Sequence, residues 1–217
     1  LGVADAQGAL LAAARDPEPR VREAALQALA ASSPQSAPPQ AAVEVAESLL
    51  ARDGWSFVRA QAVGVLAKAA AGAGVDEALG GALHDKAVAV RGAALVALGK
   101  RRAWSLRKAI RERLDDKDED AEVRSAAARA LGGVCDTGSA ERLTELARGL
   151  GALGATEDDQ QVALAALVGL AALQPRDLRD RLKPLLTPPA APYVRAAAEQ
   201  ALAARGACQG DAAPVSR

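Results

Sequence analysis

The segment "DEDAEVRSAAARAL", residues 118–131, contains the pattern that decides the fold. Apolar residues stand at Val123 and at three, four, seven and eight positions after it, so they share one face of an α-helix. Asp118 stands five residues before this valine, close to the start of the helix, where the positive end of the helix dipole favours a carboxylate. The segment therefore predicts an amphipathic helix with one buried face.

This pattern recurs along the 217 residues, and a second amphipathic stretch precedes each copy. Neither helix of such a pair can bury its apolar face alone, so neighbouring pairs must stack. The sequence predicts an all-α fold, a right-handed α-solenoid of about six antiparallel helix pairs. The pattern begins at Val21, Val58, Val90, Val123, Val162 and Val194, and the preceding helices are predicted over 3–14, 42–51, 75–84, 104–115, 138–148 and 176–186.

We predict a single solenoid domain over residues 1–204. Residues 205–217 are small and polar, and we expect them to form a flexible tail. The predicted repeat units are approximately 1–33, 41–71, 75–102, 103–136, 138–174 and 176–204.

An arginine follows the valine in five of the six copies, and an acid stands five residues before it in the first five. This Asp-x4-Val-Arg register resembles the HEAT-repeat family, in particular the bacterial HEAT-like repeats of the phycobilisome-lyase type. The resemblance implies a ladder of hydrogen bonds between neighbouring repeats, in which an arginine from the next repeat pairs with each aspartate. The ladder residues are Asp16, Arg22, Asp53, Arg59, Asp85, Arg91, Asp118, Arg124 and Arg195, and Ala163 interrupts the ladder in the fifth repeat.

The composition argues against most kinds of catalytic site. One histidine and two distant cysteines, Cys135 and Cys208, show neither zinc-ligand spacing nor a disulfide framework. No serine has a histidine base nearby. We therefore expect no catalytic residue, metal or cofactor, and we expect the chain not to be an enzyme. The sequence leaves the compartment and the oligomeric state open.

The charge balance argues against two classes of partner. The chain has 27 basic and 27 acidic residues, so no overall field attracts it to nucleic acid or to an anionic membrane. No stretch approaches the ~18 apolar residues of a membrane span.

A partner surface is expected on the exposed side of the second helices, two and six residues after each valine. The side chains there are small and nearly uncharged, which suits a protein or peptide partner rather than a phosphate backbone. In the fifth repeat, residues 162–173 are apolar on all sides. Either the loop 149–161 folds over this helix, or the helix forms the centre of a protein-binding groove. The candidate partner-binding residues are Gly92, Val96, Arg129, Leu164, Leu167 and Val168.

The segment "KRRAWSLRKAIRERL", residues 100–114, is strongly basic. Residues 100–113 carry seven basic side chains and one acid, net +6, and residues 115–122 carry six acids and one basic side chain, net −5. We interpret the segment as a structural helix under a solvated basic surface, in which nearby cations cover the tryptophan ring. A secondary docking patch for an acidic partner is the alternative. The patch residues are Trp104, Arg107, Lys108 and Arg111.

The leading functional hypothesis is a non-catalytic scaffold or adaptor that holds a peptide or protein on an extended solenoid surface. One alternative is a binder of nucleic acid or another anionic partner through the basic helix 100–113. A second alternative, implied by the family resemblance, is an accessory subunit of a lyase-like enzyme.

Overall fold

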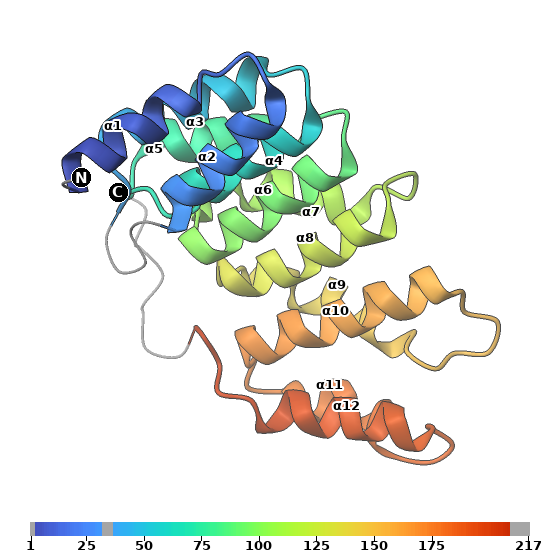
Figure 1. Cartoon of the computed structure of the whole chain (residues 1–217). Helices are drawn as coiled ribbons and strands as arrows, with labels where there is room; N and C mark the ends of the chain where they lie inside the picture. The colour runs from blue at the N-terminus through green and yellow to red at the C-terminus, as the bar shows by residue number, and fades with distance from the viewer. Residues whose placement is uncertain (1–2, 32–36, 209–217) are drawn as a thin grey trace. The chain divides into compact units, whose positions relative to one another are not determined.

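The structure is a computed structural model that describes residues 3–31 and 37–208. The chain divides into two compact units, Leu1–Arg101 and Arg102–Arg217. Within the described ranges there are twelve α-helices and no β-strand, arranged as three successive helix pairs in each unit (Figure 1). The prediction of an all-α solenoid of paired helices is confirmed.

In the first unit, each helix contacts its partner in the pair and the equivalent helices of neighbouring pairs. The second helices α2, α4 and α6 are in contact in that order, and the first helices α1, α3 and α5 form the other layer. The helices are α1 (Val3–Ala13), α2 (Pro19–Ala31), α3 (Gln40–Arg52), α4 (Ser56–Leu66), α5 (Ala73–Ala82) and α6 (Val88–Arg101).

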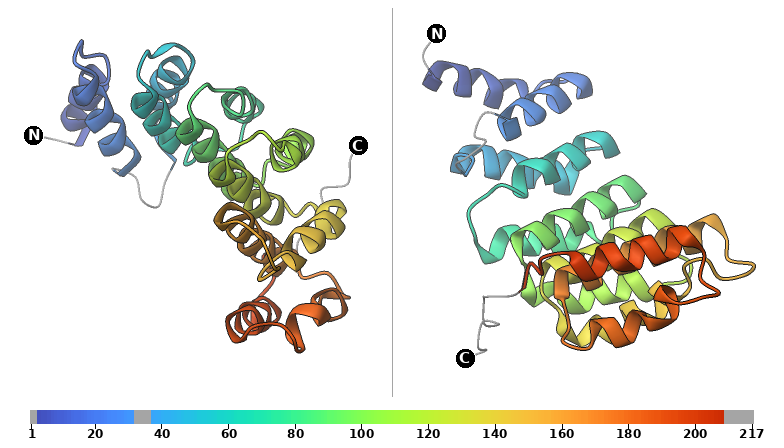
Figure 2. Two further views of the ribbon diagram at one scale, coloured as in Figure 1. Left: turned by 90° about the vertical axis from the view of Figure 1, so that its right-hand side faces the viewer. Right: turned by 90° about the horizontal axis from the view of Figure 1, so that it is seen from below.

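The second unit repeats this two-layer arrangement. The helices α8, α10 and α12 lie side by side in one layer, and α7, α9 and α11 lie in the other (Figure 2, left). Short 3₁₀ turns, Trp104–Leu106 and Thr137–Ser139, lead into α7 and α9. The α-helices are α7 (Arg107–Asp115), α8 (Ala121–Gly133), α9 (Ala140–Arg148), α10 (Glu157–Leu173), α11 (Leu178–Leu186) and α12 (Pro192–Ala203).

The helix starts follow local chemistry that the sequence contains. Asp53 and Asp85 each accept a hydrogen bond from the backbone N–H two residues later, at 2.9 and 2.8 Å, just before a second helix begins. Asp120 caps α8 in the same way, and Thr156 forms a capping box with Asp159 at the start of α10. These turns set the register in which the apolar face of each second helix enters the core.

The core of each layer consists mainly of alanine, leucine and valine. Five of the six repeat valines, Val58, Val90, Val123, Val162 and Val194, are buried, whereas Val21 in the first repeat is 38% exposed. Because alanine adds little width, neighbouring helices can approach closely without large voids.

Candidate functional site

The second unit has an apolar cavity, a groove between α10 and α12. Its volume is about 280 Å³, and Gln200 supplies the one polar side chain among its lining residues. Leu164 and Val168 are 45% and 53% exposed, although such side chains are normally buried. We call this cavity the apolar groove. It is lined by Leu164, Leu167, Val168 and Ala171 on one side and by Ala197, Gln200, Ala201 and Ala204 on the other.

At the preceding junction, between α8 and α10, glycines let the two backbones touch. A Cβ atom on Gly169 would lie 2.5 Å from the Ala128 carbonyl oxygen, and one on Gly132 would lie 2.7 Å from the Gly169 carbonyl oxygen. Ala172 lies level with Gly132, so residue numbers increase in the same direction along both helices.

The ladder residues are missing at the α10–α12 junction. Ala163 replaces the arginine and is buried, and Pro189 stands where the next repeat would supply its acid. The α10–α12 junction therefore has no pair of side chains able to form the ion pair found elsewhere.

Hydrogen bonds join the C-terminal ends of α10 and α12 at one end of the apolar groove. The Gln174 side-chain amide donates to the carbonyl oxygens of Ala201 and Ala204, at 2.9 and 3.0 Å. Four residues after Ala204, Cys208 forms a disulfide bond with Cys135 at the end of α8, and its N–H donates to the Ala172 carbonyl.

This disulfide corrects the expectation that the two cysteines form no disulfide framework. The Cα atoms of Cys135 and Cys208 lie 5.6 Å apart although 73 residues separate them in sequence. The disulfide therefore attaches the first part of the predicted tail to the helices. A hydrogen bond adds to this attachment, because Arg102 donates to the Ala207 carbonyl oxygen at 2.8 Å. Residues 209–217 of that tail lie outside the described residues.

The long loop of the fifth repeat does not cover the groove. In this loop, the Gly151 N–H donates a hydrogen bond to the side chain of Gln160. Gly151 lies against Val194 and Tyr193 at the start of α12, because a Cβ added to Gly151 would meet their side chains. This is the end of α12 opposite to Ala204. Leu153 in this loop is fully exposed, and Leu164 and Val168 remain open to solvent. Of the two arrangements left open by the sequence, the structure has the exposed groove.

The predicted partner-binding residues divide into exposed and buried positions. Leu164, Val168, Val96 and Arg129 are exposed, and the first two lie together in the groove. Leu167 is only 3% exposed because neighbouring helices cover that face of α10, so it supports the groove floor.

Gly92 is also buried, and it lies with Val96 on α6 in the first unit. These two residues therefore belong to a different compact unit from the groove.

The basic stretch is not one helix, which corrects the predicted helix over 100–113. The helix α6 ends at Arg101, Arg102 has a positive φ of 53°, and α7 begins at Arg107. The boundary between the compact units also falls after Arg101, whose guanidinium binds Asp76 at 2.7 Å within the first unit.

Most of the cations that follow have local partners. Arg107 lies over the Trp104 ring, 4.3 Å from its centre, as the interpretation of a covered tryptophan expects. Arg111 is held by both carboxylate oxygens of Asp136 at 2.6 Å, and this hydrogen bonding raises the pKa of the Arg111 guanidinium. Lys108 is exposed. The predicted basic patch thus retains few cations open to a phosphate.

Ladder rungs are present in the first unit. Arg22 binds Asp53 at 2.7 Å, and Arg59 binds both carboxylate oxygens of Asp85 at 2.7 Å. The hydrogen bond from Arg59 holds the pKa of the Asp85 carboxyl below its usual range. In each rung the arginine comes from the preceding repeat, whereas the sequence interpretation placed it in the next one.

The ladder arginines also bind backbone carbonyls of their own repeats. Arg22, Arg59 and Arg91 each donate to the carbonyl six residues earlier, at Asp16, Asp53 and Asp85. In the second unit, Arg124 donates to Leu114 and Arg195 to Ala190. Asp118 is exposed, and a rung between it and Arg91 would join the two units and stays a prediction.

A second set of ion pairs joins the first helices of the second unit, and the sequence interpretation missed it. Arg142 on α9 binds Asp115 at the end of α7, and Arg181 on α11 binds Glu141 on α9, at 2.7 and 2.6 Å. These residues do not recur at a fixed repeat position, so only their opposite charges were visible in the sequence.

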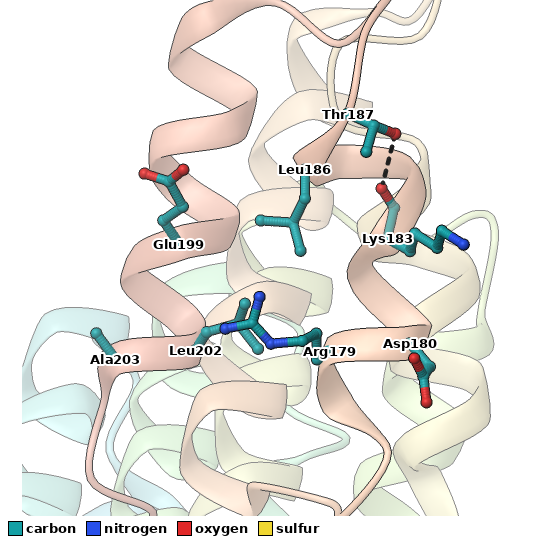
Figure 3. Close-up of a pocket in the computed structure, with 8 residues that line it drawn as sticks. All are labelled: Arg179, Asp180, Lys183, Leu186, Thr187, Glu199, Leu202 and Ala203. Carbon is teal, nitrogen blue, oxygen red and sulfur yellow. Dashed lines mark hydrogen bonds between the residues drawn. The ribbon is translucent and has the colours of Figure 1, made fainter.

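A larger cavity of about 700 Å³ lies between α11 and α12. Figure 3 shows Arg179, Asp180 and Lys183 on α11 and Glu199 on α12 around Leu186 and Leu202. All four charged side chains are exposed and of both signs. The cavity therefore lacks the dry apolar lining with a few convergent polar groups that typifies a ligand pocket.

The described part of the chain offers neither a metal-binding cluster nor a helix suited to span a membrane. Residues 3–31 and 37–208 contain no group of three or more His, Cys, Asp or Glu side chains placed to hold a metal ion. In the same ranges, no helix combines the length and apolar character needed to cross a bilayer.

Comparisons with known proteins agree with this architecture. Sequence profiles described as HEAT repeats match residues 76–149, and a HEAT repeat profile matches residues 7–35. They support a HEAT-repeat protein, but the phycobilisome-lyase type stays a prediction. No curated protein matches the chain.

Among solved structures, the chain is similar to an engineered protein determined by the Northeast Structural Genomics Consortium. The two chains are 24% identical, with a TM-score of 0.57, over 90% of this chain and 94% of the other. At this identity the likeness concerns the fold alone.

Proposed function

We propose that the chain is a non-catalytic scaffold that holds a peptide or protein partner in the apolar groove between α10 and α12. The observation that carries the proposal is the exposure of Leu164 and Val168 side by side in a groove that no loop within residues 3–31 and 37–208 covers. Proteins built from HEAT repeats typically act as protein-interaction scaffolds, which agrees with this use of the surface.

The chemistry of the groove supports binding rather than catalysis. Its eight lining residues include no acid, base or nucleophile, and Gln200 can only donate or accept hydrogen bonds.

The volume of the groove supports a macromolecular partner. Pockets for drug-sized ligands usually measure about 300–1,000 Å³ and enclose most of the ligand. The groove, at about 280 Å³, lies at the lower limit of this range and has room for a few apolar side chains that anchor a larger partner.

A selection from a random peptide library displayed on phage tests this proposal, because the library samples many sequences and requires no identified partner. The immobilised protein should enrich a family of related peptides. The double variant Leu164→Ser/Val168→Ser should lose that enrichment, because it makes the groove polar without changing the buried Leu167.

Leu153→Ser is the matched control, since it removes a fully exposed leucine outside the groove. It should enrich the same peptides as the parent protein, and circular dichroism should show unchanged helicity for all three proteins. Equal enrichment by the double variant, or no enrichment by the parent protein, would contradict the proposal.

A further inference from the structure

The lining of the groove offers few hydrogen-bonding groups, and this bears on the secondary structure of the partner. Its walls are helices whose backbone groups are already paired within each helix, and its lining offers one polar side chain, Gln200. An extended peptide in this groove would bury N–H and C=O groups without hydrogen-bond partners, which is costly. A helix satisfies its own backbone groups and can present an apolar face.

The dimensions of the groove also match a short stretch of helix. On α10 the lining runs from Leu164 to Ala171, and on α12 from Ala197 to Ala204. Seven residues of helix rise about 10 Å, or two turns. Two apolar side chains on one helical face, at i and i+4, would lie over Leu164 and Val168.

The charge next to the groove identifies the polar side of that partner. Arg129 on α8 is exposed, and it forms no hydrogen bond or ion pair within the described residues. The close contacts of Ala128 with Gly169 and of Gly132 with Ala172 place Arg129 within one helical turn of Val168, because the two helices run in the same direction. A cation thus flanks the apolar groove at its Val168 end.

The opposite end has the reverse charge. Glu157 is exposed and lies seven residues before Leu164, on the same face of α10. An acidic residue of the partner is therefore attracted at the Val168 end and repelled at the Leu164 end.

We infer that the partner of the apolar groove is an amphipathic α-helix with an apolar pair at i and i+4 and an acidic residue next to Arg129. This inference rests on the proposed function. It adds the partner's secondary structure, the spacing of its anchors and the sign and position of its charge.

A charge-reversal selection tests the inference. Peptides of about 16 residues, long enough to form a helix on binding, are selected on the parent protein and on Arg129→Glu. The parent protein should enrich peptides with two apolar residues four apart and a nearby Asp or Glu. Arg129→Glu should enrich Lys or Arg at that same place, and should bind the original peptides about fivefold more weakly.

Arg129→Gln serves as a second variant without a new charge, and it should bind both peptide sets with similar affinity. Three results would overturn the inference: proline-rich or otherwise non-helical peptides, helical peptides with no acidic preference, or an unchanged peptide set on Arg129→Glu. Dependence of binding on Leu164 and Val168 in those cases would leave the proposed function intact.

A second copy of the chain is the competing occupant. Sedimentation of the parent protein should show a monomer at concentrations where the peptides bind. A dimer that the Leu164→Ser/Val168→Ser variant dissociates would assign the groove to self-association, and would overturn the inference.

Discussion

The two junctions on either side of α10 differ in how close the helices come. At the α8–α10 junction, Gly132 and Gly169 remove the side chains that would separate the backbones. At the α10–α12 junction, Leu164 and Val168 stand at the edge of a groove, and the residues of a ladder rung are absent. One helix thus has a core contact on one side and an open apolar surface on the other. In the second unit, the size of the side chains at a junction therefore decides whether a close helix contact or an open groove is present.

The largest effect is expected from removal of the disulfide, which links the end of α8 to the segment after α12. The variant Cys135→Ser/Cys208→Ser should lower the free energy of unfolding of the oxidised protein by about 4 kcal/mol, because the bond closes a long loop. Urea unfolding with and without a dithiol reductant measures this. A parent protein as stable in reductant as without it would contradict the expectation.

The same disulfide should affect the groove, since Cys208 lies four residues after Ala204. Selected peptides should bind the parent protein more weakly after reduction of the bond. The double serine variant should bind them equally in both conditions.

The next largest effect concerns the close junction. Gly169→Ala should lower the free energy of unfolding by about 3 kcal/mol, because its Cβ would lie 2.5 Å from the Ala128 carbonyl oxygen. Gly92→Ala is the matched control, as a helical glycine with no atom within 4 Å of the added Cβ. It should raise stability by about 0.5–1 kcal/mol through helix propensity. Equal effects of both substitutions would show that the α8–α10 contact is looser than described.

A smaller effect is expected from removal of the Arg59–Asp85 ladder rung in the first unit, since the α10–α12 junction has no such rung. Asp85→Asn should lower the free energy of unfolding by about 2 kcal/mol at neutral pH, because it removes a charged partner from the buried Arg59. Thermal melting of the two proteins at pH 7 measures this difference.

The same rung predicts a pH dependence. Arg59 lowers the pKa of the Asp85 carboxyl. The stabilisation of the fold by this ion pair is therefore complete above the ordinary carboxyl pKa of about 4, and it is lost as the pH falls through the lowered pKa. Between pH 4 and pH 2 the variant should therefore lose less stability than the parent protein. Parallel pH profiles would argue against this linkage.

The smallest effect on stability is expected in the groove itself. Leu164→Ser/Val168→Ser should change the free energy of unfolding by no more than about 0.5 kcal/mol, because both side chains are about half exposed. A large loss of stability would show that they pack as core residues.

Helix positions were predictable from the sequence because each repeat carries its own apolar period and its own turn. The exposure of Leu164 and Val168 also followed from their places after Val162. Burial of Leu167 did not, because it depends on which neighbouring helices cover α10. The pairing of Cys135 with Cys208 was hidden for a similar reason, since stacking of three helix pairs brings together residues that are 73 positions apart.

The direction of the ladder was a further point that the sequence could not determine. An aspartate and an arginine in every repeat can pair with the repeat before or after, and only the stacking geometry distinguishes Arg22–Asp53 from the reverse. The pair of Arg111 with Asp136 was missed because neither residue recurs in register.

Methyl NMR of the protein with a selected peptide tests the central claim most directly. Addition of the peptide should shift the methyl resonances of Leu164 and Val168, while those of Leu153 and of Val96 in the first unit stay in place. Shifts at Leu153 or Val96 without shifts at Leu164 and Val168 would contradict the account, because the peptide would then bind outside the α10–α12 groove.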